Sequence, residues 1–181
     1  MDMQEKKISG EVIYKGRVVT LVRDKVLCPN GEESYREVVK HNGGACILGV
    51  TNDNKIFLER QYRYAYDEVL YELPAGKLEP NEEPLNAAIR EFEEETGYKA
   101  LKMELLGIDY PTCGYSNERL YLFYTNDFVK TKTNFDSDEV IELELVALSD
   151  ALTMIKEGKI KDGKTINAIM LYLLKENKIS L

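Results

Sequence analysis

The sequence has few of the residues that build disulfide frameworks, histidine metal sites or membrane spans. The one histidine, His41, has no partner in the sequence, so we expect it to be structural or to lie on the surface. The three cysteines, Cys28, Cys46 and Cys113, share no metal-ligand spacing. Three reduced thiols are typical of a cytoplasmic protein. The longest apolar run, Ala45–Val50, is far shorter than the ~20 residues that a membrane span needs. The opening MDMQEKKISG lacks the apolar stretch of a secretion signal. We therefore expect a cytoplasmic protein with no membrane partner.

Positive charge is also scarce. Acidic residues outnumber basic ones 32 to 24, which gives a formal net charge of −8 and an isoelectric point near 4.9. Proteins that bind a phosphate backbone need a basic face, so we expect no nucleic-acid partner. Hydrophobic residues make up 44% of the chain and charged ones 31%, which argues against wholesale disorder. A length of 181 residues predicts a single domain overall.

The chain changes from β character to mixed α/β character along its length. Alternating apolar residues and turn signals such as Pro29–Gly31 predict short strands over the first third, with Ala45–Val50 as a buried strand. Asn81 suits a helix N-cap, Pro84 a first helical turn, and Gly97 a helix end. The second half contains further predicted elements, namely strands at Leu120–Tyr124 and Val140–Val146 and helices at Ser149–Glu157 and Thr165–Glu176. This order indicates an α/β (α+β) fold.

Residues Gly158–Thr165 spell GKIKDGKT, which satisfies the P-loop pattern. Such a loose pattern arises by chance at about 10⁻⁴ per starting position. A P-loop also needs a buried strand before its glycine loop, whereas Ala151–Ile155 is typical of an amphipathic helix. We therefore predict a helix-turn-helix junction with exposed lysines. A P-loop nucleotide-binding protein is the rival hypothesis, which Lys164→Ala would reveal by abolishing nucleotide binding.

A second motif, GKLEPNEEPLNAAIREFEEETGY at Gly76–Tyr98, concentrates carboxylates on one helix. At about 100° per residue, Glu91, Glu94 and Glu95 form a patch beside the buried edge, with Glu95 nearest to it. Like charges at this spacing disfavour a helix by roughly 0.2–0.5 kcal/mol per pair, and Arg90 offsets only one of them. Hard oxygen ligands at this spacing suit Mg²⁺ or Mn²⁺ held together with substrate phosphates. A charge run by itself, however, is more often a solvated acidic face.

The wider pattern favours the metal site. The spacing G-x5-E-x7-R-E-φ-x-E-E-x-G-φ is matched in full by Gly76, Glu82, Arg90, Glu91, Glu94, Glu95 and Gly97, with Phe92 and Tyr98 at the apolar positions. Seven fixed residues coincide by chance on the order of 10⁻⁷ per starting position. The chain thus resembles the Nudix hydrolases, which cleave a nucleoside diphosphate linked to another group. The resemblance implies an α/β/α sandwich with a mixed sheet, preceded here by an N-terminal antiparallel β segment.

Flanking segments resemble the ADP-ribose pyrophosphatase branch of that family. Its characteristic segments are matched in order by Glu59–Tyr64, Tyr71–Gly76, Tyr110–Glu118 and the acidic Asp138-Glu139. The chain departs from the branch at Cys113, usually proline, and at Asn81, usually glycine. The resemblance implies hydrolysis of ADP-ribose to AMP and ribose 5-phosphate, while the preferred nucleoside diphosphate sugar stays open. The alternatives are a Nudix hydrolase of another nucleotide, or a Nudix-fold binding module without turnover.

The resemblance also implies roles for the acidic cluster. The implied ligands of Mg²⁺, or of Mn²⁺ in its place, are three carboxylates and one carbonyl, those of Glu91, Glu94, Glu95 and Ala75. Glu82 and Arg90 would orient these ligands, and together with Glu95 they belong to the predicted catalytic set. A mobile acid must take the proton from the attacking water. We predict Glu139 for this role, with Asp138 and Glu118 as alternatives.

Substrate contacts are implied upstream and downstream of the cluster. The implied contacts are Arg60, Arg63, Glu72 and Glu118. Three tyrosines near the arginines, Tyr62, Tyr64 and Tyr66, are candidates to line a nucleotide pocket, with core packing expected for at least one of them.

The N-terminal segment is predicted to mediate dimerisation. Residues 1–40 form the expected β segment, and residues 41–181 the expected Nudix hydrolase domain. Apolar residues alternate over Val12–Val22, so we expect these strands to pack across the two-fold axis of a homodimer. The only other expected partner is the small-molecule nucleotide sugar.

Overall fold

The computed structural model describes residues 3–134 and 140–178 of the chain. The chain forms two compact units: a first unit of Met1–Gly43 with Tyr110–Arg119, and a second unit of Gly44–Asp109 with Leu120–Leu181. The first unit contains the N-terminal segment predicted from the sequence. Its second part, Tyr110–Arg119, was not expected to belong with that segment.

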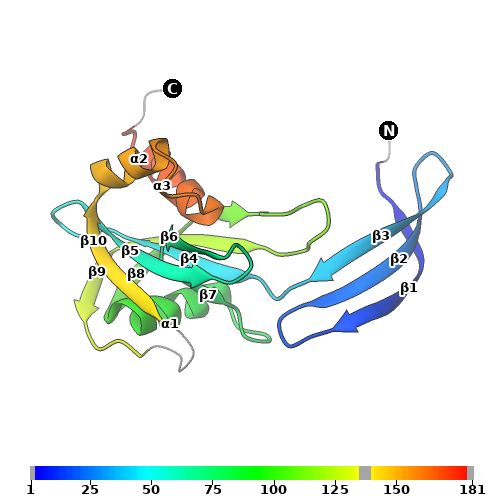
Figure 1. Cartoon of the computed structure of the whole chain (residues 1–181), viewed down its shortest axis with the longest axis horizontal. Helices are drawn as coiled ribbons and strands as arrows, with labels where there is room; N and C mark the ends of the chain where they lie inside the picture. The colour runs from blue at the N-terminus through cyan, green and yellow to red at the C-terminus, as the bar shows by residue number, and fades with distance from the viewer. Residues whose placement is uncertain (1–2, 135–139, 179–181) are drawn as a thin grey trace. The chain divides into compact units, whose positions relative to one another are not determined.

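The first unit is built on an antiparallel three-stranded sheet in the order β1 (Lys6–Lys15), β2 (Thr20–Leu27) and β3 (Glu33–Lys40), coloured blue in Figure 1. Of the apolar side chains on these strands, Val22 and Val26 on the central strand are buried, and every residue of β1 is exposed. The predicted strands are confirmed, but this sheet alone buries little apolar surface.

The second unit contains two sheets. The mixed sheet has the order β7 (Ala75–Lys77), β4 (Gly44–Gly49), β9 (Leu120–Lys130) and β8 (Tyr98–Asp109). Strands β4 and β9 are parallel, whereas β7 and β8 run antiparallel to the strands next to them. The other sheet is antiparallel, in the order β10 (Ile141–Ala147), β5 (Lys55–Arg63) and β6 (Glu68–Glu72). Strand β8 was not predicted. Its register shifts interrupt the regular alternation that marks a strand in sequence.

Helix α1 (Pro84–Thr96) carries the acidic motif. Pro84 at its start and Gly97 at its end are confirmed, with Gly97 in the left-handed conformation (φ 71°) that ends helices. The predicted N-cap Asn81 is wrong, because the N-cap is Glu83, without a side-chain capping bond. Asn81 instead adopts a φ of 65°. Asparagine tolerates this conformation better than most residues, so it can replace the family's usual glycine there.

Helices α2 (Leu148–Lys156) and α3 (Gly163–Lys175) begin and end within two residues of the predicted limits. Helix α1 packs against one side of the sheets, and α2 and α3 lie on the other side (Figure 1). This arrangement confirms the predicted mixed α/β sandwich. No helix in residues 3–134 and 140–178 is long and apolar enough to cross a membrane.

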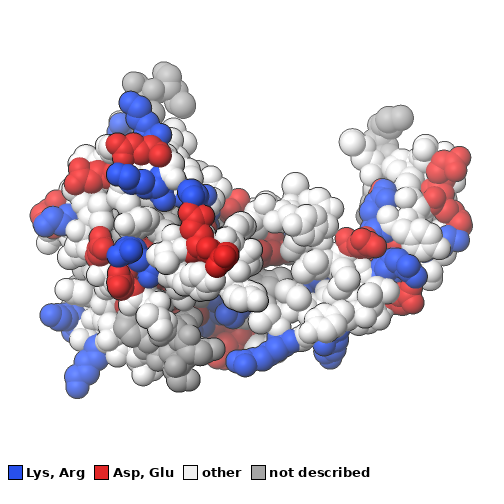
Figure 2. All heavy atoms as spheres, in the orientation of Figure 1, with Lys and Arg blue, Asp and Glu red and all other residues white. Residues whose placement is uncertain are grey.

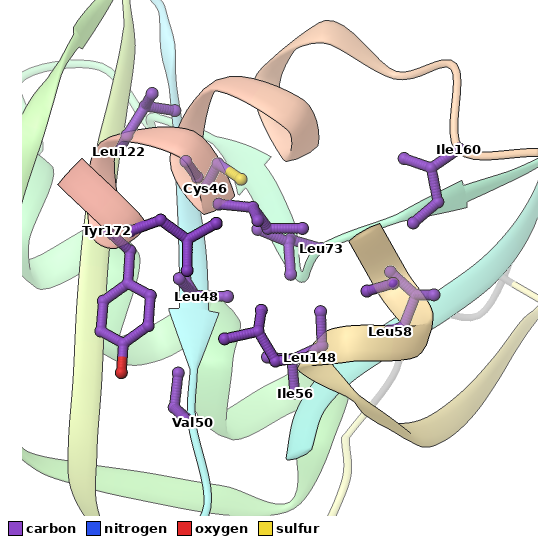
Figure 3. Packing of buried hydrophobic residues seen from close by; sticks show 14 residues of the cluster. Cys46, Leu48, Val50, Ile56, Leu58, Leu73, Leu122, Leu148, Ile160 and Tyr172 are labelled. Carbon is purple, nitrogen blue, oxygen red and sulfur yellow. The ribbon is translucent and has the colours of Figure 1, made fainter. Parts of the chain in front are cut away.

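The core lies on both faces of strand β4, whose six residues are all buried. Because successive side chains of a strand point to opposite faces, Ala45 and Ile47 pack on the α1 side with Phe92. Cys46 and Leu48 pack on the opposite side with residues of α2 and α3, as Figure 3 shows. Through these two clusters, α1 packs on one face of β4 and α3 packs on the other face. Strand β4 is thereby the common support for the groups described next.

On the face of the molecule seen in Figure 2, acidic and basic side chains are interspersed. The surplus of negative charge in the composition is therefore not gathered into one block on this face.

Candidate active site

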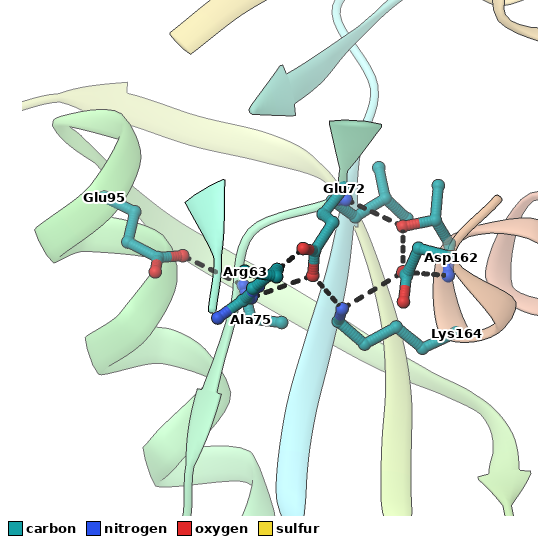
Figure 4. A network of polar contacts seen from close by, with 8 residues as sticks. Arg63, Glu72, Ala75, Glu95, Asp162 and Lys164 are labelled. Atoms are coloured by element: carbon teal, nitrogen blue, oxygen red, sulfur yellow. Dashed lines mark hydrogen bonds and ion pairs between the residues drawn. The ribbon is translucent and has the colours of Figure 1, made fainter. Parts of the chain in front are cut away.

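Two carboxylates of α1 lie against the backbone of Ala75 and Gly76. The Ala75 N–H donates a hydrogen bond to Glu95 Oε2 at 2.9 Å (Figure 4), and Glu95 is only 5% exposed. A Cβ atom on Gly76 would lie 1.9 Å from the carboxyl carbon of Glu91. A side chain at this position would therefore displace the Glu91 carboxylate. The structure brings Glu91 and Glu95 close to the Ala75–Gly76 segment, and their role as metal ligands stays a prediction.

Arg90 links the other acids of the motif. Its Nε and Nη2 donate hydrogen bonds to the two carboxylate oxygens of Glu82, at 3.1 and 3.0 Å. Its Nη1 lies 2.8 Å from Glu91 and 3.1 Å from Glu94. The hydrogen bonds from Arg90 lower the pKa of Glu82, and the same bonds raise the pKa of Arg90. One guanidinium thus contacts three carboxylates, those of Glu82, Glu91 and Glu94.

The donor atoms of these acids and of the Ala75–Gly76 segment are oxygens, as a divalent cation needs. Within residues 3–134 and 140–178, no three histidine, cysteine or acidic side chains converge closely enough to enclose an ion, and Arg90 engages Glu91 and Glu94. The chemistry of the donors nevertheless fits, because carboxylates from successive turns of one helix face a carbonyl-bearing segment, and Mg²⁺ prefers oxygen ligands. Glu94 lies to one side of this group, in a depression that it lines with Lys99 and Lys132.

A second polar group surrounds Glu72, at the end of β6 and three residues before Ala75. Glu72 is 3% exposed and accepts two hydrogen bonds from Arg63, from Nε at 2.6 Å and from Nη2 at 2.8 Å. The ammonium of Lys164 on α3 donates a further hydrogen bond to it (Figure 4). Burial by itself would raise the pKa of Glu72, but Arg63 and Lys164 together lower it. The carboxylate is therefore ionised and fully paired.

Arg60 is not brought together with Arg63. It lies three positions earlier on the same strand, so its side chain leaves the opposite face. There it pairs with Glu142 at 2.7 Å and stacks over the ring of Tyr71. The assignment of Arg60 as a substrate contact stays a prediction.

The tyrosines at the end of β5 and in the turn between β5 and β6 lie outside the core. Tyr62, Tyr64 and Tyr66 are all exposed, so the expected core packing of at least one of them is wrong. Their role in lining a nucleotide pocket stays a prediction.

Glu118 belongs to the first unit. Its Oε1 lies 3.3 Å from Nδ1 of His41, and the same ring nitrogen accepts a hydrogen bond from the Gly43 N–H. His41 is thus a structural residue of that unit, in line with its predicted role. Glu139, predicted as the base, and Asp138, an alternative to it, lie outside the described residues.

The segment GKIKDGKT is not a P-loop. The segment follows helix α2 instead of a strand, and it leads into α3. The expected junction between helices is confirmed, but its lysines are not all exposed, because the Lys164 side chain is 12% exposed and pairs with both Glu72 and Asp162. Sequence reasoning missed this pairing. The only local signal was Asp162, three residues before Thr165, at the spacing of a helix N-cap.

Comparisons with known proteins show what the chain is similar to. A family model described as the NUDIX domain matches residues 40–169. The chain is 39% identical over 176 residues to an ADP-ribose pyrophosphatase of Bacillus subtilis (strain 168), covering 96% of this chain and 95% of that protein. It is 42% identical, with the same coverage, to a methanol dehydrogenase activator of Bacillus methanolicus. A solved structure titled as an ADP compounds hydrolase superposes with a TM-score of 0.84 at 17% identity, over 99% of this chain and 100% of that one, which shows a shared fold.

Proposed function

Because the chain belongs to the Nudix family, we propose that it hydrolyses the diphosphate bond of ADP-ribose or a related nucleoside diphosphate sugar, using Mg²⁺. Mn²⁺ would serve in its place. The observation that carries this proposal is the contact of Glu91 and Glu95 with the Ala75–Gly76 segment. The choice of ADP-ribose is supported by the relative that is named an ADP-ribose pyrophosphatase. It is also supported by the Arg63–Glu72 pair, which precedes this segment in the chain.

Each group has a physical task in this reaction. A bound divalent cation would neutralise diphosphate oxygens and lower the pKa of the attacking water. Glu91, Glu95 and the Ala75 carbonyl would hold it, with Glu94 at the side and Glu82 and Arg90 fixing their orientation. Arg63 uses Nε and Nη2 on Glu72, which leaves Nη1 to bind a diphosphate oxygen.

The bond changes are those of a hydrolysis. Water oxygen attacks one phosphorus atom, the bond from that phosphorus to the bridging oxygen breaks, and an acidic side chain takes the water proton. We assign this last role to Glu139, with Asp138 and Glu118 as the alternatives. From ADP-ribose the products are AMP and ribose 5-phosphate.

A substrate panel tests the proposed function. With Mg²⁺ present, ADP-ribose is expected to give a higher kcat/KM than NADH, diadenosine polyphosphates or 8-oxo-dGTP, because the residues around Arg63 and Glu72 match the ADP-ribose branch. Products are identified by chromatography, and a parallel reaction with a chelator should show no turnover. A preference of about tenfold for any of the other three, some 1.4 kcal/mol in transition-state binding, would exclude this substrate. Tight binding of ADP-ribose without turnover would instead indicate a binding module.

We further propose that the protein is a homodimer formed through the first unit. The sheet β1–β3 carries exposed apolar side chains on its outer strand and hairpins, including Val12 at 61% and Tyr14 at 60% exposure. Exposed apolar groups gathered on a sheet that buries little of its own surface are typical of an association surface. Such a surface on one chain would meet the same surface on a second copy.

Val12→Glu is expected to shift this dimer towards monomer, because it would place a charge within the apolar surface of both copies. Light scattering after gel filtration measures the mass. Val129→Glu is the matched control, since Val129 is an exposed valine on β9 of the second unit. A wild-type monomer, or a Val12→Glu variant that dimerises as wild type does, would refute this interface.

A further inference from the structure

The helix α3 N-terminus reaches the end of β6 through two separate contacts. The Thr165 hydroxyl oxygen accepts a hydrogen bond from the Leu73 N–H at 2.8 Å, which fixes the backbone next to Glu72. Lys164, the preceding residue, pairs with the Glu72 carboxylate itself. Both contacts join residues 92 positions apart in the sequence. The N-terminus of α3 therefore helps to fix the position of Glu72.

The charges along this path alternate in sign. The N-terminus of α3 carries the positive end of the helix dipole, and Asp162 caps it by accepting hydrogen bonds from the N–H and hydroxyl of Thr165. Lys164 lies 3.0 Å from Asp162 and also contacts Glu72, and Glu72 holds Arg63. Every charge is thus flanked by opposite charge, from the helix end to the guanidinium of Arg63.

Arg63 is the outer end of this path. Its side chain is 37% exposed, and Glu72 occupies one edge of the guanidinium, through Nε and Nη2. Within the part of the chain that the structure describes, Nη1 has no hydrogen-bond or ion-pair partner. Without Lys164, the negative charge of Glu72 would be balanced by Arg63 alone. The positive charge of Arg63 would then be more fully neutralised, and Arg63 would attract an anion less strongly. Lys164 satisfies that carboxylate from the buried side.

We propose that Lys164 is a positioning residue, which holds Glu72 and, through it, orients the free edge of Arg63 towards the diphosphate of the substrate. The proposal rests on the proposed function, because it takes Arg63 as the group that binds the diphosphate. It also gives the GKIKDGKT segment a role different from a P-loop, since Lys164 acts from within the protein and does not touch the nucleotide.

The first test compares Lys164→Met with wild type. Methionine keeps most of the length of the side chain and removes its charge, so KM for ADP-ribose is expected to rise by about tenfold or more, with kcat changed by less than about threefold. Lys161→Met is the matched control. Lys161 lies in the same segment and pairs with the exposed Glu68, so its loss should leave KM within about twofold of wild type.

A second background separates positioning from a general structural role. If Lys164 acts through Arg63, then adding Lys164→Met to Arg63→Met should change substrate affinity by less than about twofold. A merely structural lysine would weaken affinity by the same factor in both backgrounds. Circular dichroism and thermal melting verify folding, and Lys164→Gln replaces Lys164→Met if the latter does not fold. Failure of both variants to fold would mark Lys164 as structural and overturn the proposal.

ADP serves as a probe that does not depend on turnover. Its dissociation constant, measured by calorimetry with Mg²⁺, should rise by about tenfold in Lys164→Met. If wild type binds ADP but does not hydrolyse ADP-ribose, the proposed function fails while this comparison still stands. If wild type hydrolyses ADP-ribose and Lys164→Met matches it in KM and in ADP affinity, the Lys164 proposal alone is overturned. A wild type that does neither overturns both.

Discussion

Glu95→Gln is expected to lower kcat on ADP-ribose by at least about 10²-fold, comparable to the loss of one major electrostatic contact in a transition state. Glu95 is almost fully buried and accepts the Ala75 N–H, so it is held against the segment that supplies the carbonyl ligand. Glutamine keeps the shape, the helix propensity and an oxygen for that hydrogen bond. The substitution therefore removes a charge and little else.

The stability of the same variant distinguishes a metal ligand from a structural acid. Without metal, Glu95→Gln should be as stable as wild type, or more stable by a few tenths of a kcal/mol, because one like-charge repulsion with Glu91 is removed. Glu93→Gln is the matched control, since Glu93 stands on the same helix but contacts Lys99 at 3.7 Å. Turnover of Glu95→Gln within about threefold of the wild-type rate would show that Glu95 is not a ligand.

Gly76→Ala is expected to lower kcat/KM by about tenfold or more, since a 1 Å misplacement of catalytic groups can cost 10²-fold. The added methyl group would overlap the Glu91 carboxylate, whose carbon lies 1.9 Å from the position of that Cβ atom. Glu91 must then move away from the Ala75–Gly76 segment. The end of a glutamate side chain can rotate, so unfolding midpoints should change little. The effect should appear in steady-state kinetics and in a higher Mg²⁺ concentration for half-maximal rate.

Gly163→Ala provides the control for that substitution. Apart from its two chain neighbours and the backbone of its own helix, a Cβ atom on Gly163 would meet none of the described atoms within 4 Å, so this variant adds the same methyl group without displacing a packed neighbour. Equal kinetics for Gly76→Ala and wild type would mean that the position of Glu91 against Gly76 is not needed for activity.

The parts of the site that the sequence predicted are local ones. The acids of α1 are three and four residues apart, so helix geometry alone places Glu95 at the buried edge and lets Arg90 reach Glu94, and the structure has both. The end of α1 was likewise predictable, because Gly97 has a conformation that few other residues adopt.

The parts that were missed depend on contacts between distant segments. The pairing of Lys164 with Glu72 spans 92 positions, and the local N-cap signal at Asp162 indicates only where α3 begins. The grouping of Tyr110–Arg119 with the N-terminal sheet is non-local in the same way, through hydrogen bonds such as that from the Val39 N–H to Tyr115. The N-cap error at Asn81 has a local cause, because asparagine serves equally as a cap and as a left-handed residue.

Binding of Mn²⁺ to the protein alone, measured by electron paramagnetic resonance, tests most directly whether the acids of α1 form a metal site. Wild type and Glu93→Gln should bind the ion with equal affinity, and Glu95→Gln should bind it at least about tenfold more weakly, because one of its carboxylate ligands is gone. This readout needs neither substrate nor turnover. Equal Mn²⁺ affinity for all three proteins would contradict the account and identify the cluster as an acidic face without a ligand role.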